Sequence, residues 1–268
     1  MPPDSSHPTD LRVAAAIGLA AGVLGGLFGV GGGLIIVPGL VLVAKLDRRL
    51  ASGTSLAATM PIALASVITY AVNGNIDAAV VALLTVGAVG GAVLGTKLLM
   101  VLPVRTLTIV FIVTVLATAV RLFQTTETTG RSEITLAMAG ALILVGVLTG
   151  TLSGLLGIGG GIVMVPAMIV LFGMEPVIAK GSSVTVIVPT SVTGTVRNRY
   201  RANVDLRVAA VVGLSGAASA VAGGIVADGL SSSISNVMFA VLLVLVAASQ
   251  FATLRTGRVR VASSETTA

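Results

Sequence analysis

Long apolar segments alternate with short polar stretches along the whole chain, a pattern typical of a protein that crosses a membrane several times. Uncharged segments such as 13–44, 51–76 and 106–120 reach or approach the roughly 20 residues that a membrane-spanning helix needs. Six clear spans are predicted, at residues 51–72, 78–98, 104–123, 181–197, 207–227 and 234–254. The pattern therefore predicts an all-α polytopic membrane protein.

A glycine-rich block occurs twice within this apolar pattern. Gly26–Gly33, followed by Val37 and Pro38, returns as Gly154–Gly161, followed by Val165 and Pro166, an offset of 128 residues (154 minus 26). Without any gap, 16 of the 56 residue pairs between 22–77 and 150–205 are identical. Such self-similarity indicates an internal duplication. The predicted organisation is a polar N-terminal tail (1–10), repeat 1 (11–125), a linker (126–133), repeat 2 (134–255) and a C-terminal tail (256–268).

The loops of the two repeats carry opposite charge patterns. Lys45, Arg48 and Arg49 in the first repeat correspond to uncharged residues in the second. The cation-free loop 73–77 corresponds to a stretch that contains Arg197, Arg199 and Arg201. Because cytoplasmic loops collect Lys and Arg, the two repeats are predicted to cross the membrane in opposite directions, with both termini cytoplasmic and the linker extracytoplasmic. Inverted repeats are a recurring transporter architecture, with the substrate site at mid-membrane between the repeats.

Each repeat opens with an apolar segment that contains the glycine block, at residues 11–44 and 134–172. The second of these segments must begin and end on the same side of the membrane if the loop assignment holds. Its first arm has 17–19 residues, whereas the arm after the glycines has about 11, enough for about 17 Å of helix. Each segment is therefore predicted to be a helical hairpin with its glycine tip near mid-membrane, re-entrant or fully spanning. The total is 8–10 membrane helices.

Consecutive glycines are unfavourable inside a helix, since each glycine destabilises the helix by about 1 kcal/mol relative to alanine. The helix is therefore expected to break and to restart near Leu34 and Ile162. The first N–H groups of a helix lack intrahelical partners and carry the positive end of the helix dipole, so they attract anions. The candidate substrate-binding glycines are Gly31, Gly32, Gly33, Gly159, Gly160 and Gly161. The alternative is that glycines allow close helix packing, which is the role expected where they recur every four residues, as at 22/26, 87/91/95 and 146/150/154.

Hydroxyl side chains open the span after each hairpin. Thr54, Ser55, Ser182 and Ser183 are candidate donors to an anion, with capping of the helix N-terminus as the alternative. Four prolines, Pro38, Pro61, Pro166 and Pro189, are predicted helix-kink positions. Asp77 and Asp205 are expected to cap the following helices, and Thr59, Thr190, Ser191 and Thr193 lie near the kinks.

Composition narrows the chemistry. The chain has no cysteine and only one histidine, His7 in the polar tail, so no metal site, cofactor or catalytic set is expected. In a membrane protein, the net charge of +6 is expected to reflect cations collected in cytoplasmic loops. With two Tyr and no Trp, the chain offers nothing that resembles a base-stacking surface for nucleic acid. No Asp, Glu, Lys or His falls at the centre of a predicted span. A site of neutral donors and dipoles suits an anion.

The doubled Gly-x-Gly-Gly-Gly-x-x-x-x-Pro block, followed by Gly-Thr-Ser at 53–55 and Gly-Ser-Ser at 181–183, resembles the sulfite exporter TauE/SafE family over residues 11–255. The resemblance implies an inner-membrane transporter of small sulfur-containing anions, sulfite or an organosulfonate. The resulting hypothesis is a non-enzymatic permease that works by alternating access in the lipid bilayer, with a homodimer as a possible assembly. The alternatives are an anion channel and a non-transporting membrane subunit or sensor.

Overall fold

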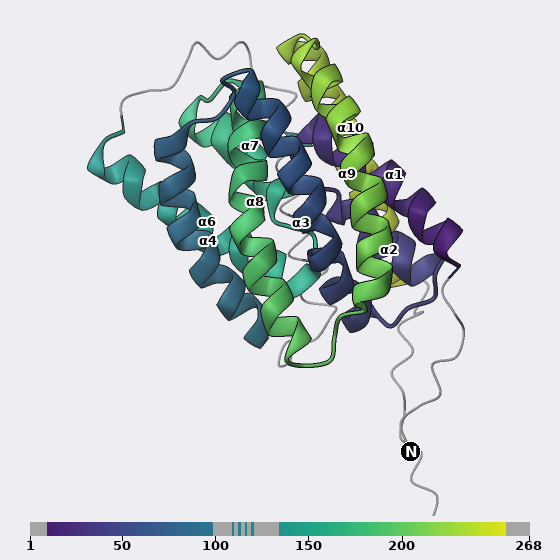
Figure 1. Cartoon of the computed structure of the whole chain (residues 1–268). Helices are drawn as coiled ribbons and strands as arrows, with labels where there is room; N and C mark the ends of the chain where they lie inside the picture. Colours follow the sequence, from purple (N-terminus) through teal and green to yellow (C-terminus); the bar gives the residue numbers. More distant parts are fainter. Residues whose placement is uncertain are drawn as a thin grey trace, which may run out of the picture.

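The computed structural model describes residues 10–98 and 134–255, together with residues 109, 112, 113, 116, 119 and 120 (Figure 1). Every regular element in this described part is an α-helix. The linker 126–133, the C-terminal tail, nearly all of the N-terminal tail and most of the predicted span 104–123 lie outside the described residues. The six described positions between 109 and 120 are helical.

The described residues form nine labelled helices. They are α1 (Leu11–Phe28), α2 (Gly33–Leu42), α3 (Arg48–Val72), α4 (Ala78–Leu98), α6 (Leu136–Leu156), α7 (Gly161–Phe172), α8 (Pro176–Arg199), α9 (Leu206–Asp228) and α10 (Ser232–Arg255). Five of these helices, α1, α3, α4, α6 and α9, are long and apolar enough to cross a bilayer. The chain is therefore a polytopic all-α membrane protein, as its apolar pattern predicts.

Each repeat begins with a helical hairpin whose second arm is short. α1 has 18 residues and α2 has 10, while α6 has 21 and α7 has 12. The second arms begin at Gly33 and Gly161, one residue earlier than expected. In the first hairpin, Gly32 lies against the carbonyl of Ala21, and Gly39 lies against the side chain of Ile17. The two arms therefore fold back on each other, as expected from the chain length available.

The helices that follow the hairpins begin earlier than the sequence suggested. α3 begins at Arg48 instead of 51 because the Asp47 carboxylate accepts a hydrogen bond from the Arg49 N–H (3.0 Å) and caps the helix. α8 begins at Pro176 instead of 181, since proline is well suited to the first turn of a helix. The expected caps Asp77 and Asp205 are confirmed, because each carboxylate accepts from two N–H groups of the following helix.

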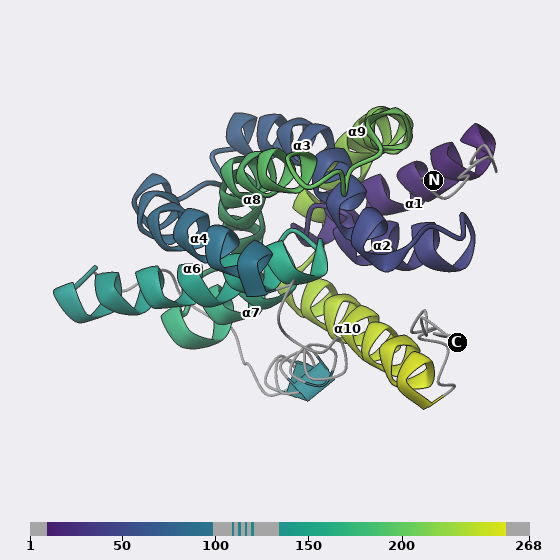
Figure 2. The same cartoon turned by 90° about the horizontal axis from the view of Figure 1, so that it is seen from below.

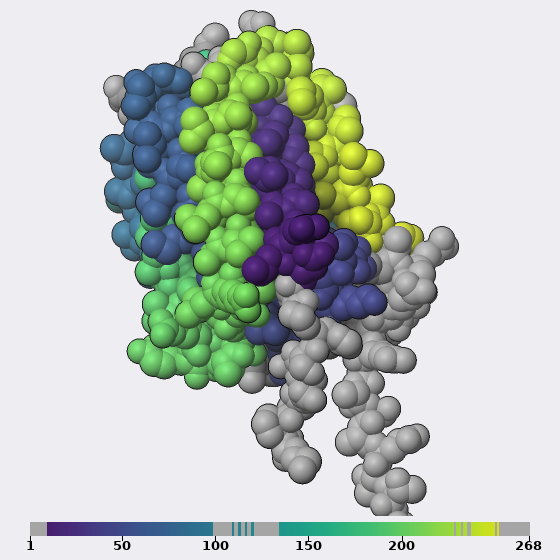
Figure 3. Space-filling view, turned by 45° about the vertical axis from the view of Figure 1, so that its right-hand side comes forward, coloured from purple at the N-terminus to yellow at the C-terminus, as the bar shows by residue number. Residues whose placement is uncertain are grey.

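Four long helices lie side by side in the order α4, α8, α3, α9, with α6 against α4 at one end and α1 against α9 at the other (Figures 1 and 2). α4 and α9 occupy equivalent places in the two repeats, as do α6 and α1. The first helix of each repeat thus packs on a helix of the other repeat. Figure 3 shows α1 at the surface between α9 and α10.

Glycines bring the helix backbones together at both of these cross-repeat contacts. A Cβ atom on Gly18, Gly22 or Gly26 of α1 would lie within 2.0–2.3 Å of the carbonyl oxygens of Val212, Gly216 and Ala220 respectively. The residues 128 positions on repeat the pattern in α6 and α4. A Cβ on Gly146, Gly150 or Gly154 would lie within 2.1–2.6 Å of the carbonyls of Leu84, Ala88 and Ala92. The packing role expected for glycines at four-residue spacing is therefore confirmed.

The contacts also give the relative directions of the helices. Because Gly18 meets Val212 and Gly26 meets Ala220, α1 and α9 run parallel. α3 and α8, which are equivalent helices of the two repeats, run antiparallel. The start of α3 at Gly53 lies against Asn203 and Asn198, and the start of α8 at Gly181 lies against Asn75 and Tyr70. These two contacts exchange under the 128-residue offset, so the described helices have a reciprocal, two-fold pattern of contact.

Two adjacent glycines of α4 test the importance of this packing. A Cβ at Gly91 would lie 2.2 Å from the Val147 carbonyl oxygen, whereas a Cβ at Gly90 would meet nothing within 4 Å. We expect Gly91→Ala to destabilise the protein by about 1–3 kcal/mol through overpacking. Gly90→Ala should be neutral or stabilising by up to about 1 kcal/mol. Thermal unfolding in detergent checks both variants. Equal melting temperatures would contradict the importance of the close contact between α4 and α6.

Candidate functional site

Positive backbone φ angles break the helix at each glycine block. Gly29, Gly31 and Gly32 have φ values of 70°, 71° and 79°. The equivalent Gly157, Gly159 and Gly160 have values of 73°, 82° and 80°. Residues with a Cβ rarely adopt these values, which explains why glycine occupies the positions. The chain therefore turns sharply between the two arms of each hairpin, and these turns are called the glycine tips below (residues 29–33 and 157–161).

The two glycine tips meet each other. A Cβ on Gly33 would lie 2.7 Å from the Ile158 carbonyl oxygen, and a Cβ on Gly161 would lie 2.6 Å from the Val30 Cα. The positions contacted, 30 and 158, are themselves equivalent in the two repeats. The contact between the tips is thus reciprocal, like the packing of the long helices.

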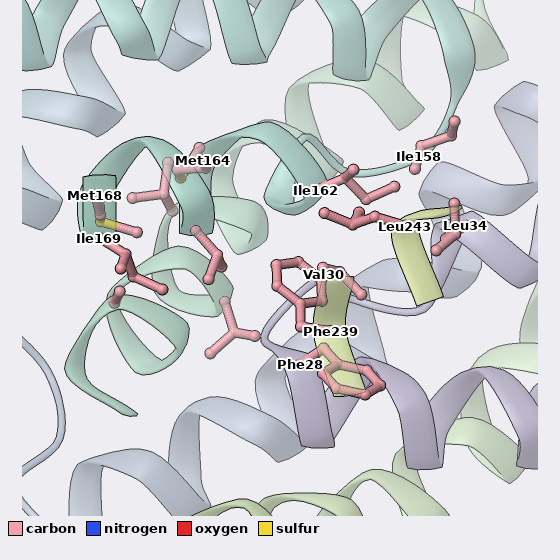
Figure 4. Close-up of a cluster of buried hydrophobic side chains, with 14 of the residues drawn as sticks. Phe28, Val30, Leu34, Ile158, Ile162, Met164, Met168, Ile169, Phe239 and Leu243 are labelled. Atoms are coloured by element: carbon pink, nitrogen blue, oxygen red, sulfur yellow. The ribbon is translucent and has the colours of Figure 1, made fainter. Parts of the chain in front are cut away.

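Equivalent residues of α3 and α8 also meet at this place. Gly31 and Gly159 both face the methyl group of Thr59 and the side chain of Ile187. Apolar side chains from both tips and from the first turns of α2 and α7 gather there, with two from α10 beside them (Figure 4). The labelled members of this group are Val30, Leu34, Ile158, Ile162, Phe239 and Leu243. The structure therefore brings four of the six candidate glycines together, Gly31 and Gly159 at Thr59 and Ile187 and Gly33 and Gly161 against the opposite tip. The other two, Gly32 and Gly160, face the first arm of their own hairpin.

Backbone N–H groups at the tips are left without acceptors. The Gly32 carbonyl accepts from the N–H groups of Ile35 and Ile36, and no side chain caps α2. The Gly160 carbonyl and α7 repeat this arrangement. Within the described part of the chain, no hydrogen bond engages the N–H groups of Gly33, Leu34, Gly161 or Ile162. Two helix N-termini with available donors therefore lie next to each other.

Thr54 and Ser182 link the two repeats, and their role as donors to an anion stays a prediction. The Thr54 hydroxyl accepts a hydrogen bond from the Asp205 N–H (2.9 Å), and the Ser182 hydroxyl accepts one from the Asp77 N–H (3.0 Å). Both hydroxyls lie within their helices, beyond the first turn, so the alternative that they cap their own helix is wrong. Each instead fixes the start of the fourth described helix of the opposite repeat.

Ser55 and Ser183 are buried hydroxyls without partners. Both side chains are 0% exposed, and neither hydroxyl has a hydrogen-bond partner. Thr59 is also 0% exposed, and its hydroxyl is likewise unpaired. Ser55 precedes Thr59 by one helical turn, or about 6 Å, and Ser183 precedes Ile187 by the same interval. Because buried polar groups are normally hydrogen-bonded, the unpaired hydroxyls at equivalent positions of the two repeats make this a candidate ligand-binding region.

The helices continue through all four prolines. Pro38, Pro61, Pro166 and Pro189 lie inside α2, α3, α7 and α8 respectively. Thr190 and Thr193 donate to carbonyls of their own helix, whereas Ser191 is a further buried hydroxyl without a partner. The kink role of the prolines stays a prediction.

Lys180 is a buried cation that lies just before the predicted span 181–197. The earlier start of α8 places it inside that helix, with its side chain only 2% exposed. Its Nζ atom lies 5.9 Å from the centroid of the Phe28 ring, at the C-terminal end of α1. Two sequence signals mark the position: Pro176 favours a helix start, and Lys180 aligns with Ser52 directly before the second Gly-Ser-Ser.

Metal-binding chemistry has no obvious place among the described residues. No group of three or more His, Cys, Asp or Glu side chains gathers there. The candidate site instead offers backbone N–H groups and hydroxyls, which bind anions or neutral polar groups.

Comparisons with known proteins agree on one family. The family model for the sulfite exporter TauE/SafE matches residues 2–141 and 142–267. The chain is 26% identical over 219 residues to the probable membrane transporter protein YunE of Bacillus subtilis, which covers 72% of this chain and 80% of that protein. It is 33% identical over 178 residues to a probable membrane transporter protein of Xylella fastidiosa, covering 64% of this chain and 66% of that protein.

No solved structure matches the chain. The family match extends over both repeats, and the relatives named above are membrane transporters rather than enzymes. The chain belongs to the sulfite exporter TauE/SafE family and is a multi-pass membrane transporter.

Proposed function

We propose that the protein moves a small oxyanion, sulfite or an organosulfonate, across the inner membrane by alternating access, and that the anion binds where the two glycine tips meet. One observation carries the proposal. Two helix N-termini with unpaired N–H groups adjoin each other, and the unpaired buried hydroxyl of Thr59 lies at the same level. Helix N-termini bind anions through their N–H groups and dipoles.

The chemistry of the site favours an oxyanion over a cation or an apolar solute. Sulfite and sulfonates present three oxygens that each accept hydrogen bonds, and the backbone N–H groups and hydroxyls can donate to them. Among the buried polar side chains of the described residues, none is Asp or Glu. A buried carboxylate would repel the anion, so this composition supports the proposal.

We further propose that the two repeats cross the membrane in opposite directions. The antiparallel packing of the equivalent helices α3 and α8 supports this arrangement, because equivalent helices of two repeats run antiparallel when one repeat is inverted relative to the other. The predicted path from the loop charges also makes α1 and α9 run the same way, in accord with their parallel contact. The expected cytoplasmic location of both termini follows from that path.

The close contact between the tips favours a carrier over a channel. Gly33 and Gly161 have no room for even one additional carbon atom. An anion therefore reaches the N–H groups only when the tips separate, which couples binding to a conformational change. A membrane potential of 100 mV, inside negative, favours the exit of one negative charge by about 2.3 kcal/mol, so export needs no coupled ion.

Flux measurements in proteoliposomes test the proposal. Radiolabelled sulfite, methanesulfonate and sulfate would be loaded in turn, and release would be followed under an imposed voltage or pH gradient. We expect saturable, voltage-dependent release of sulfite or methanesulfonate, at rates typical of a carrier. Absence of flux for every anion would overturn the proposal, and conductance far above carrier turnover would show a channel instead.

Substitutions of two adjacent hydroxyl residues on α3 distinguish a role in transport from a role in folding. Thr54 accepts a hydrogen bond within the protein, whereas Ser55 has no partner. Ser55→Ala and Ser183→Ala should therefore lower anion affinity by about tenfold, the value of one lost hydrogen bond to a charged group, with little change in thermal stability. Thr54→Val should instead destabilise the fold by about 1–3 kcal/mol, because the Asp205 N–H loses its acceptor. Full affinity in both serine variants would remove these hydroxyls from the site.

A charge introduced on α3, beside the tips, provides a second test. Thr59→Asp and Thr59→Asn change the side chain to nearly the same shape, but only aspartate brings a negative charge. We expect transport to be lost in Thr59→Asp and to persist, at reduced rate, in Thr59→Asn, because the carboxylate repels the anion at close range. Flux is compared after membrane insertion has been verified for both variants. Equal flux in the two would contradict an anion site at this level.

A further inference from the structure

Lys180 lies on the face of α8 that leads to the glycine tips. Residues at i, i+3 and i+7 share one face of a helix, so Lys180, Ser183 and Ile187 form one line along α8. Ile187 contacts Gly31 and Gly159 at the tips, and Ser183 is a buried hydroxyl without a partner. Seven residues of helix separate Lys180 from Ile187, which corresponds to about 10 Å along the axis.

The surroundings of Lys180 connect it to the first glycine tip. A Cβ on Gly29 would lie 2.6 Å from the Lys180 Cα, so the backbones are in contact. The ammonium group lies over the ring of Phe28, and this ring stacks on Phe239 of α10 with centroids 5.3 Å apart. A cation above an aromatic face is stabilised by the ring electrons, which orients the ammonium group within the protein.

The equivalent position in repeat 1 is neutral. Ser52 contacts Gly157 as Lys180 contacts Gly29, and its hydroxyl donates to the Leu156 carbonyl at the end of α6 (3.3 Å). A neutral side chain is therefore sufficient to support the tip in that repeat. Burying an ammonium group is costly, so lysine at 180 carries a penalty that serine at 52 does not. Lys180 is also the only charged residue among the buried side chains of the described residues.

We propose that Lys180 is a specificity-determining residue that supplies a fixed positive charge on one of the two half-paths that lead to the tips. The assignment rests on the proposed function. The charge favours anions that approach from the membrane face at which α8 begins, and it favours dianions more strongly than monoanions. The equivalent position on the opposite half-path is Ser52, which is neutral, so the charge at this position differs between the two faces even though the fold is reciprocal.

Charge-changing variants, measured from each membrane face, test this role. Right-side-out and inside-out vesicles would be used to measure half-saturating concentrations for sulfite, a dianion under mildly alkaline conditions, and for the monoanion methanesulfonate. At about 10 Å and an effective dielectric of about 20, one unit charge changes affinity by roughly tenfold for each negative charge of the ligand. Lys180→Met should therefore weaken sulfite binding more than methanesulfonate binding, and only at the face where α8 begins. Lys180→Arg should retain the wild-type preference.

Matched controls separate this role from a structural one. Lys45 is exposed, so Lys45→Met removes the same net charge away from the half-path. This variant should change the half-saturating concentration of neither anion. Lys180→Gln serves as a second neutral variant. Equal weakening for the two anions, or a Lys180→Met protein that behaves like Lys45→Met, would overturn the inference. Failure of both neutral variants to fold while Lys180→Arg folds would also overturn it, since the charge would then support the fold. Absence of flux in the wild-type protein would instead overturn the proposed function.

Discussion

Close backbone contact between the two repeats is the constraint on which the rest of the structure depends. Glycines at four-residue spacing let α1 approach α9 and let α6 approach α4, so each hairpin is anchored to the opposite repeat. In a bilayer, where apolar side chains gain little by leaving lipid, such close packing is the main source of helix association. These two reciprocal contacts hold the hairpins in positions where their tips meet.

The contact between the tips explains how broken helices are tolerated inside an apolar protein. Non-helical backbone at membrane depth must be buried in protein or line a polar cavity. Here the backbone of each tip is covered by the other tip and by Thr59 and Ile187. The remaining N–H groups are the unsatisfied part of this arrangement, and in the proposed mechanism the transported anion satisfies them when the tips separate.

Much of this architecture could be predicted from the chain itself. The hairpin lengths follow from the spacing of glycine and charge, and the packing glycines follow from their four-residue recurrence. The Asp77 and Asp205 caps follow from local hydrogen-bonding rules that operate within a few residues. These features depend on local geometry, which explains why the structure agrees with the sequence-based expectations.

Features that depend on contacts across the repeats could not be predicted in the same way. Thr54 accepts from Asp205, which is 151 residues away, and no local rule links the two. Lys180 lies just before the predicted span 181–197, because the apolar pattern alone does not reveal that α8 starts at Pro176. The burial of its charge depends on Gly29 and Phe28, which come from the opposite repeat.

The central claim is that the two tips must separate for an anion to cross. The chain has no cysteine, so Val30→Cys combined with Ile158→Cys provides a pair of thiols on the two tips without background labelling. Sulfite flux would be measured in proteoliposomes before and after these thiols are joined by a short reversible thiol-reactive linker. We predict that flux is lost when the tips are joined and returns when the linker is reduced. Unchanged flux through the joined protein would contradict the account.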